Sequence, residues 1–370
     1  MAVMIQDPRL SFVRLRHRGL SLFDYFDAVD RALVRLVPFE ASCWLSLDPA
    51  TMLPTSHFSR EYSFDHLMSL VANEFLEDDT NKFADLARGA RPVGTLYAAT
   101  GGHPERSRRH TTFLTPHGFG GGDELRVVFR EGAAAWGAAA FHRRTGTFTE
   151  REVGVVNDVG EVVANGIRRA ILTGAMTVER DPEAPGVVIL ESDDAVDTIS
   201  PTAHRWLGEL FDSTVATNDV PLVVASVAQE ARRAAMGRAD ALASVRVPRR
   251  SGGWLRLDAS LLEDERRVAV VLSPAREPEV ADLIARVYGL TAREREVTRL
   301  TMHGLSTREM AASLHVSPYT VQDHLKSIFD KVEVRSRREL VAQLFLQQCA
   351  PRLAQGLPPG IDGWFAGPEA

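Results

Sequence analysis

Hydrophobic positions in the first half of the chain switch between helical and strand-like spacing. Between Leu22 and Leu36 they recur at three- and four-residue steps, which predicts an amphipathic helix, and an apolar run over 41–47 predicts a buried strand. The same patterns predict a helix over 66–76, strands over 125–129 and 133–141, and a long helix that begins at the capping box Thr149–Glu152. Residues 20–175 are therefore expected to form an α+β domain, preceded by an irregular amino-terminal arm, residues 1–19.

Residues 185–275 repeat the mixture of strands and helices on a smaller scale. Two strands come first, then two helices, then three strands separated by short polar turns. The expected strands are 186–190, 196–199, 244–248, 254–261 and 268–272, and the expected helices are 201–210 and 221–236. Polar stretches with proline at 176–184 and 273–279 are predicted linkers, so the pattern favours three domains in all.

Four helix starts follow one another closely between residues 289 and 346. Three pairs have the spacing of capping boxes, in which a hydroxyl and a carboxylate satisfy N–H groups of the first turn. The pairs are Thr291 with Glu294, Ser306 with Glu309, and Ser336 with Glu339. The fourth start is Ser317–Pro318, because serine caps a helix and proline fits its first position. We therefore expect an all-α four-helix domain over 280–346 and a disordered tail over 347–370.

The third of these helices has two different faces. Val321, Leu325, Ile328 and Val332 fall within about 40° of one another around the helix, which predicts a buried stripe. The opposite face carries the polar side chains Tyr319, Gln322, Asp323, Lys326 and Asp330. Since only residues 315–317 separate this helix from the preceding one, the pair has the form of a helix-turn-helix, whose second helix fits the ~12 Å major groove. A bundle used for dimerisation is the alternative interpretation.

Charge is divided unevenly along the 370 residues, whose net charge is -6. Residues 289–346 hold nine basic and seven acidic residues, whereas residues 1–288 are acidic overall. Contact with nucleic acid is thus expected only in the helical domain, where the candidate phosphate ligands are Arg308, Lys326, Lys331, Arg335, Arg337 and Arg338. No apolar run approaches ~18 residues and no secretory signal is evident, so we expect a cytoplasmic protein without membrane contact.

Several residues in the front part of the chain have both a functional and a structural interpretation. Cys43 is a ligand or redox cysteine, or more commonly a small buried hydrophobe. The histidines His103, His110 and His117 are spaced by seven, but the proline and arginines among them favour a mobile polar loop over a metal site. Gly118–Gly122 lacks the Gly-Lys-Ser/Thr of a P-loop, which leaves a flexible turn.

Four aromatic residues have two interpretations, as the lining of a pocket or as part of the core. Trp44, Phe58, Trp136 and Phe141 lie on or near expected strands, where aromatics more often belong to the core. No nucleophile–base pair or pair of carboxylates is recognised, and neither Cys43 nor Cys349 has metal-binding spacing. We therefore expect no enzyme, no cofactor and no metal.

Five stretches of the helical domain form a specific set. They are LTAREREV (290–297), GLSTREMA (304–311), L-x-V-S-x-x-T-V-x-x-H-L (314–325), I-x-x-K (328–331) and SRRELV (336–341). Through them the segment closely resembles the DNA-binding domain of LuxR-type transcriptional regulators. The resemblance implies a helix-turn-helix that binds double-stranded DNA as a homodimer, with Gln322, Asp323 and Lys326 at base-facing positions. Gln322 stands where the family often has lysine, and Glu333 where it usually has glycine.

The expected DNA contacts combine this resemblance with the caps and charges. They are Ser306, Thr307, Arg308, Ser317, Tyr319, Thr320, Gln322, Asp323, Lys326, Lys331, Arg335 and Arg337. By element order residues 20–175 resemble a GAF domain and residues 185–275 a PAS-type domain, and residues 38–58 are similar to sensor domains of some LuxR-type regulators. Ser317, Thr320 and Arg337 are expected to position the DNA backbone.

The expected protein is a multidomain LuxR-family regulator. Its α+β GAF-like and PAS-like sensor domains gate the all-α helix-turn-helix domain through a small-molecule effector or a partner such as RNA polymerase. Two alternatives remain open at this point. One is a signalling protein whose front domains bind another protein, with DNA contact secondary, and the other is an enzyme in the GAF-like region.

Overall fold

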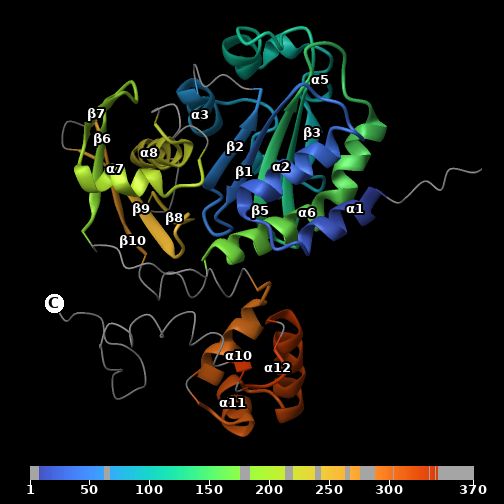
Figure 1. Ribbon diagram of the computed structural model, residues 1–370, viewed down its shortest axis with the longest axis vertical. Helices are drawn as coiled ribbons and strands as arrows, with labels where there is room; N and C mark the ends of the chain where they lie inside the picture. The colour runs from blue at the N-terminus through green and yellow to red at the C-terminus, as the bar shows by residue number, and fades with distance from the viewer. Residues whose placement is uncertain are drawn as a thin grey trace, which may run out of the picture. The chain divides into compact units, whose positions relative to one another are not determined.

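The computed structural model describes residues 8–61, 67–175, 184–212, 220–237, 243–262, 267–275, 288–302, 304–332, 334–337 and 339–340. The chain divides into two compact units, Met1–Ala275 and Arg276–Ala370 (Figure 1). The tail predicted over 347–370, nearly all of the linker predicted over 176–184, and the side chains of Glu333 and Arg338 lie outside the described residues. The predicted domain boundaries stay predictions.

The first unit begins with a five-stranded antiparallel sheet in the order β2-β1-β5-β4-β3. Its strands are β1 (Ala41–Leu47), β2 (Pro54–Arg60), β3 (Val93–Thr95), β4 (Glu124–Glu131) and β5 (Ala134–His142). Helices α1 (Pro8–Arg16), α2 (Leu22–Leu33) and α6 (Glu150–Ala175) pack together, and α6 lies on β4 and β5. Between helices and sheet, the ring of Trp44 stacks on Phe129 with 5.4 Å between centroids, and its indole N–H donates to Asp30.

Shorter elements connect the strands of this sheet. The helices are α3 (Leu67–Phe75), α4 (Phe83–Arg88) and α5 (Leu96–Ala99), and single turns η1 (Pro104–Arg106) and η2 (His110–Leu114) follow. The buried side chains of Phe113 and Leu114 fix η2, so the loop expected around the three histidines is locally helical. Gly122 is required by a close approach, since a Cβ atom there would lie 1.8 Å from the carbonyl oxygen of Arg143.

A second five-stranded antiparallel sheet has the order β7-β6-β10-β9-β8. Its strands are β6 (Gly186–Leu190), β7 (Val196–Ile199), β8 (Ser244–Pro248), β9 (Trp254–Leu261) and β10 (Val268–Pro274), and its helices are α7 (Pro201–Gly208) and α8 (Leu222–Ala235). Counted within each sheet, both orders are second, first, fifth, fourth, third. The two halves of the unit therefore share one topology, although no sequence repeat is evident.

The buried helix α8 joins the two halves. It packs on β9 and β10 of its own sheet and on β2 and α3 of the first (Figure 1). Leu222 and Ala225 lie in a cluster with Leu45 and Leu47, whereas Val224 belongs to the core of the second sheet. The alanine-rich sequence of α8 permits this double burial, because small side chains let backbones approach closely on both sides.

An ion pair adds a polar link between the halves. Arg246 of β8 donates to Asp48, which follows β1, through three contacts of 3.0 to 3.1 Å, and the Asp48 side chain is 0% exposed. The main-chain N–H of His57 in β2 also donates to the carbonyl of Phe211 at 2.8 Å.

The sequence-based elements need three corrections in this unit. Residues 8–16 of the expected irregular arm form α1, whose Phe12 is fully buried, because α1 packs against α6. The linker expected from residue 273 begins too early, since β10 continues to Pro274. Strand β2 and the short elements β3, α4 and α5 are not foreseen, because their polar or brief sequences give no clear period.

The second unit is helical throughout its described part. Helices α10 (Ala292–Met302), α11 (Thr307–Leu314) and α12 (Pro318–Val332) contact one another, and residues 337 and 339–340 begin the fourth helix that the sequence predicts.

Replacing Asp48 with asparagine tests the link between the halves. We expect Asp48→Asn to lower the free energy of unfolding of the first unit by about 3 kcal/mol, because it removes the fully buried carboxylate charge that accepts from Arg246. Urea unfolding followed by tryptophan fluorescence measures the loss. The exposed pair Asp85–Arg88 supplies the control, since Asp85→Asn should change stability by less than about 0.5 kcal/mol. Equal effects of the two substitutions would contradict this account.

Candidate nucleic-acid interface and internal cavity

Helices α11 and α12 are separated by a tight turn with defined ends. Ser306 and Glu309 form the predicted capping box at the start of α11. His315 ends α11 in the left-handed region at φ 53°. Ser317 then caps α12 by accepting from the N–H of Thr320 at 3.1 Å, and Pro318 occupies the first position of the helix. The helix-turn-helix that the sequence predicts is therefore confirmed.

Helix α12 buries one face and exposes the other. Val321, Leu325, Ile328 and Val332 are all buried, as the periodicity predicts. On the outer face Gln322, Asp323 and Lys326 are exposed, and Tyr319 is 79% exposed although it is aromatic. A firmly packed inner face therefore supports an outer face of hydrogen-bonding side chains.

Glu294 ties α10 to α12 by a buried carboxylate. One oxygen accepts from the main-chain N–H of Thr291 in the predicted capping box, at 2.6 Å. Both oxygens also accept from the ammonium of Lys331, at 2.6 and 2.8 Å, and Ser327 donates at 2.7 Å. Burial raises the pKa of Glu294, but the hydrogen bonds from Lys331, Ser327 and Thr291 outweigh burial and lower the pKa to about 2.

The remaining residues expected at the DNA interface fall into two groups. Ser306, Arg308, Ser317 and Arg335 are exposed, and Thr307 and Thr320 are half-buried beside them. By contrast, Lys331 is held by Glu294, and a guanidinium N–H of Arg337 donates to the carbonyl of Leu305. Contact of all twelve residues with DNA stays a prediction, but these last two cations have structural partners.

One of the three predicted capping boxes differs from expectation. The N–H of Glu339 donates to Ser336 as expected, at 3.1 Å. The carboxylate of Glu339 accepts from the N–H of Arg335 instead of the N–H of Ser336. This hydrogen bond between Arg335 and Glu339 holds the segment that leads into the fourth helix.

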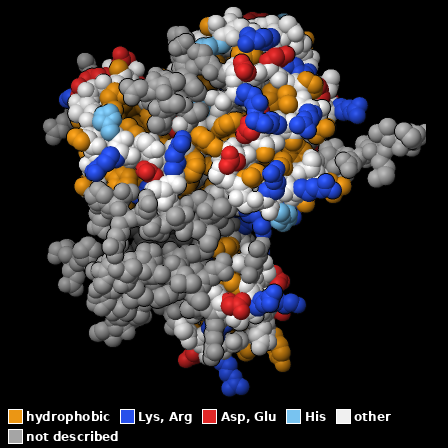
Figure 2. Space-filling view, in the orientation of Figure 1, with side chains coloured by type: hydrophobic (Ala, Val, Ile, Leu, Met, Phe, Trp, Pro, Cys, Tyr) orange, Lys and Arg blue, Asp and Glu red, His pale blue; other side chains and the backbone are white. Residues whose placement is uncertain are grey.

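Basic side chains protrude from the second unit with acidic ones between them, as Figure 2 shows. This mixed surface agrees with the small positive charge of residues 289–346 and differs from a uniform basic patch. An interface of this kind relies on placed contacts more than on bulk charge.

A cavity of about 320 Å³ lies inside the first unit, between the first sheet, α3, α4 and α8. Its apolar walls include Leu45, Leu47, Val71, Phe75 and Leu222. Polar lining comes from Cys43, Glu74, Glu124, Arg126, Ser226 and Glu230. Because both halves of the unit contribute walls, the cavity exists only while they stay packed together.

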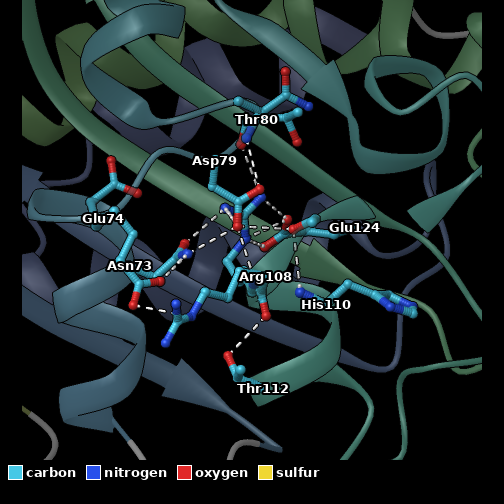
Figure 3. Close-up of polar contacts among 12 residues, drawn as sticks. Asn73, Glu74, Asp79, Thr80, Arg108, His110, Thr112 and Glu124 are labelled. Atoms are coloured by element: carbon cyan, nitrogen blue, oxygen red, sulfur yellow. Dashed lines mark hydrogen bonds and ion pairs between the residues drawn. The ribbon is translucent and has the colours of Figure 1, made fainter. Parts of the chain in front are cut away.

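The polar side of the cavity adjoins a buried charge network (Figure 3). The guanidinium of Arg109 is fully buried and donates to Glu124 at 2.7 and 3.0 Å, and Asp79 accepts from the main-chain N–H of Arg109 at 2.8 Å. Burial raises the pKa of Glu124, but Arg109 and then Arg126 outweigh burial and hold the pKa below its ordinary value. Glu124 thus remains a carboxylate in the cavity wall.

The aromatic residues considered as a pocket belong to the core. Trp44, Trp136 and Phe141 are buried, Phe58 packs against Phe23 and Phe26, and none of these four lines the cavity. Of the three histidines, His103 pairs with Glu105 at the surface, whereas His117 contacts the carbonyl of Phe113 at 2.7 Å. Among the described residues, no group of three or more side chains is placed to hold a metal ion.

A cluster that the sequence did not reveal lies at one end of the cavity. Cys43 hydrogen-bonds His57, and the Nδ1 atom of His57 lies 3.4 Å from a carboxylate oxygen of Asp212. Strand β2, which carries His57, was not expected, and Asp212 is 155 residues away from it in sequence. The alternating pattern Thr55, His57, Ser59 beside a β-strand that contains Cys43 was the available signal.

No helix in the described ranges is long and apolar enough to cross a membrane.

Replacing Glu294 tests how α12 is held. We expect Glu294→Gln to lower the free energy of opening of α12 by about 2 kcal/mol at pH 7, measured by hydrogen exchange of the α12 amides in the full chain. The pKa is depressed in the folded state, so the stabilisation is complete above pH 4.5 and is lost as the pH falls toward 2. The half-buried Glu296, which pairs with Arg293 in the same helix, is the control. An equal loss of the free energy of opening in Glu296→Gln would contradict the role assigned to Glu294.

The family match of this chain lies within the second unit. The family described as bacterial regulatory proteins, luxR family, matches residues 289–344. The monoamine regulon transcriptional regulator of Klebsiella aerogenes is 33% identical over 100 residues, 26% of this chain and 44% of that protein. FixJ of Bradyrhizobium diazoefficiens is 33% identical over 87 residues, 21% of this chain and 42% of that protein. The chain thus spans less than half the length of these relatives.

Solved structures add similarities of low score. SdiA of Escherichia coli aligns over 92% of this chain and 96% of its own, with 11% identity and a TM-score of 0.32. The VqsR LBD domain from Pseudomonas aeruginosa covers 45% of this chain and 95% of its own, with 10% identity and a TM-score of 0.31. The family match, in contrast, coincides with the caps, the turn and the buried stripe of α10–α12. Residues 289–344 of this chain thus match the family of bacterial regulatory proteins, luxR family, in sequence and carry its helix-turn-helix.

Proposed function

We propose that this protein is a cytoplasmic transcription regulator that binds double-stranded DNA through the outer face of α12. The observation that carries the proposal is the exposed row Gln322, Asp323 and Lys326 on a helix that is buried behind, follows a three-residue turn and lies in the segment matched by the luxR family. A helix with this support fits the major groove, where each base pair presents its own pattern of donors and acceptors.

The side chains of this face have different roles in the proposal. Gln322, Asp323 and Lys326 read bases, and Asp323 is suited to accept from a cytosine amino group while it repels misplaced phosphates. Ser317, Thr320 and the exposed Arg308 hold the DNA backbone, because they lie at or near the amino-terminal ends of α11 and α12. Tyr319 adds contact area at the start of α12.

In this proposal Lys331 and Arg337 contribute less to DNA binding than the sequence suggests. Neutralising a phosphate requires a cation that can leave its present partner, and the Lys331 ammonium is held by both oxygens of Glu294. We assign these two residues mainly to the shape of the domain. The expected homodimer would place two copies of α12 on half-sites about one helical turn apart.

The first unit is proposed as the sensor, with a GAF-like half at 20–175 and a PAS-like half at 185–275. Support comes from the common strand order of the two sheets and from the cavity lined by both halves. A small-molecule effector in this cavity would alter the packing of α8 between the halves, and so the state of the unit to which the DNA-binding domain is attached. RNA polymerase is the proposed protein partner once DNA is bound.

Removal of one exposed cation tests the DNA interface. On an operator selected from random duplexes, Lys326→Ala should weaken binding by about tenfold and reduce the slope of log affinity against log salt by about 0.9, because a cation that lies beside the DNA phosphates as it reads the groove is lost. Arg31→Ala, which removes an exposed charge from α2 of the first unit, should leave the slope unchanged. Unchanged affinity and slope for Lys326→Ala would mean that α12 does not face DNA.

The sensor proposal is tested by native mass spectrometry of the full chain purified from its host. We expect dimers in which each chain retains a small molecule, and release of that molecule should change operator affinity. The comparison is the same protein after unfolding and refolding without ligand. Identical operator affinity of both preparations, with bound molecule detected only in the first, would refute gating by an effector.

A further inference from the structure

Cys43, His57 and Asp212 form a chain of contacts that leads from the cavity to α8. Cys43 pairs with Ser59 and Leu45 with His57 across β1 and β2, so Cys43, Leu45 and His57 project from the same face of the sheet. The Cys43 side chain lines the cavity and hydrogen-bonds His57, which lies 3.4 Å from Asp212. The second oxygen of Asp212 accepts from the N–H of Leu222, at 2.8 Å, where α8 begins.

The imidazole of this cluster carries a charge in unusual surroundings. The side chains of His57 and Asp212 are 2% and 1% exposed. Burial lowers the pKa of His57, but the neighbouring Cys43 and then Asp212 outweigh burial and raise the pKa to about 10. His142, on the same face of the sheet, shows the contrast, since burial lowers its pKa to about 4. A protonated imidazole beside a cysteine, oriented by a carboxylate, is the arrangement that activates thiol nucleophiles.

Two hydrogen-bond donors in the cavity wall lack partners. The hydroxyl of Ser226 on α8 and the Nε–H of Arg126 on β4 make no hydrogen bond within the described part of the chain, and these residues are only 1% and 4% exposed. Buried polar groups are normally paired, so both sites call for an acceptor. Arg126 and Cys43 flank Ala140 in one register row across the sheet, which places the donor and the sulfur on a common floor.

The apolar walls, the unpaired donors and the Cys43 sulfur beside His57 together define a ligand class. The walls favour a hydrocarbon body, the donors an oxygen acceptor, and the sulfur an electrophilic carbon. We propose that the cavity captures a small α,β-unsaturated carbonyl compound by covalent addition of the Cys43 sulfur. The inference rests on the proposal that the cavity receives an effector, but it does not depend on DNA binding.

The addition balances without any further reagent. A sulfur electron pair forms a bond to the β-carbon, and the electron pair of the carbon–carbon double bond moves toward the carbonyl to give an enolate. The proton that the thiol gave to His57 passes to the α-carbon, so the thioether product contains every atom of the thiol and the ligand. Asp212 positions the imidazole for both transfers, and the enolate oxygen finds donors in the cavity wall.

The test uses the full chain with Cys349→Ser, which leaves Cys43 as the only cysteine. After exposure to trans-2-nonenal at pH 7, intact mass should increase by the whole mass of the aldehyde, and peptide mapping should place the adduct on Cys43. Schiff bases on lysines differ because they lose water. Cys43→Ser should abolish the adduct, whereas His57→Gln should slow it by at least about tenfold. His204→Gln, at an exposed position of α7, should have no effect.

The pH dependence of the rate of adduct formation distinguishes a Cys43 thiol activated by His57 from a thiol that is only accessible. Between pH 7 and 9 the rate should rise less than about threefold in the parent and more than about tenfold in His57→Gln, as for an ordinary thiol with a pKa near 8.5. Asp212→Asn can still accept from Leu222 and supplies the charge test should His57→Gln fail to fold. Equal rates and pH profiles in parent and folded variants, or no adduct at Cys43, would overturn the proposal. A parent that binds its operator yet does not react would refute this inference alone.

Discussion

The carboxylate of Glu294 ties α10 to α12 in the second unit. It caps α10 through Thr291 and, from the same position, accepts from Ser327 and Lys331 on α12. A buried carboxylate with so many donors is strongly oriented. The apolar stripe of α12 sets which face of the helix is buried and which faces outward. Glu294 joins that helix to α10 through Ser327 and Lys331.

In the first unit, contacts between distant segments likewise hold larger parts of the structure together. Two sheets of equal strand order are held together by the double-faced helix α8, by the pair Asp48–Arg246 and by the contact of His57 with Asp212. A cavity lies beside α8, and residues of the first sheet, α3, α4 and α8 line it. In the proposed sensor, a molecule bound in this place would change the packing between the halves.

Sequence patterns determine the local structure well where local forces dominate. The strand 41–47, the caps at Thr291, Ser306 and Ser317, and the buried stripe of α12 all follow from side-chain chemistry within one or two turns. Helix α1 and strand β2 were missed, because their burial depends on distant partners such as α6 and α8.

In the candidate sites too, the sequence predicts contacts within one helix but not contacts between distant segments. The row Gln322, Asp323 and Lys326 could be read from helical spacing, because one helix carries it. The contacts of Lys331 with Glu294 and of Arg337 with Leu305 could not be predicted from helical spacing, because each joins residues at least 32 positions apart in the sequence. Cys43, His57 and Asp212 come from three separate segments, and only the strand pairing and α8 bring them together.

Selection of preferred sequences from random DNA duplexes tests the central claim most directly, with the full chain and its Asp323→Asn variant compared side by side. If α12 reads bases, the two proteins will select sites that differ at one position of each half-site and agree elsewhere, because one acceptor has become a donor and acceptor. Identical selected sequences would contradict the account, since Asp323 would then lie away from the groove.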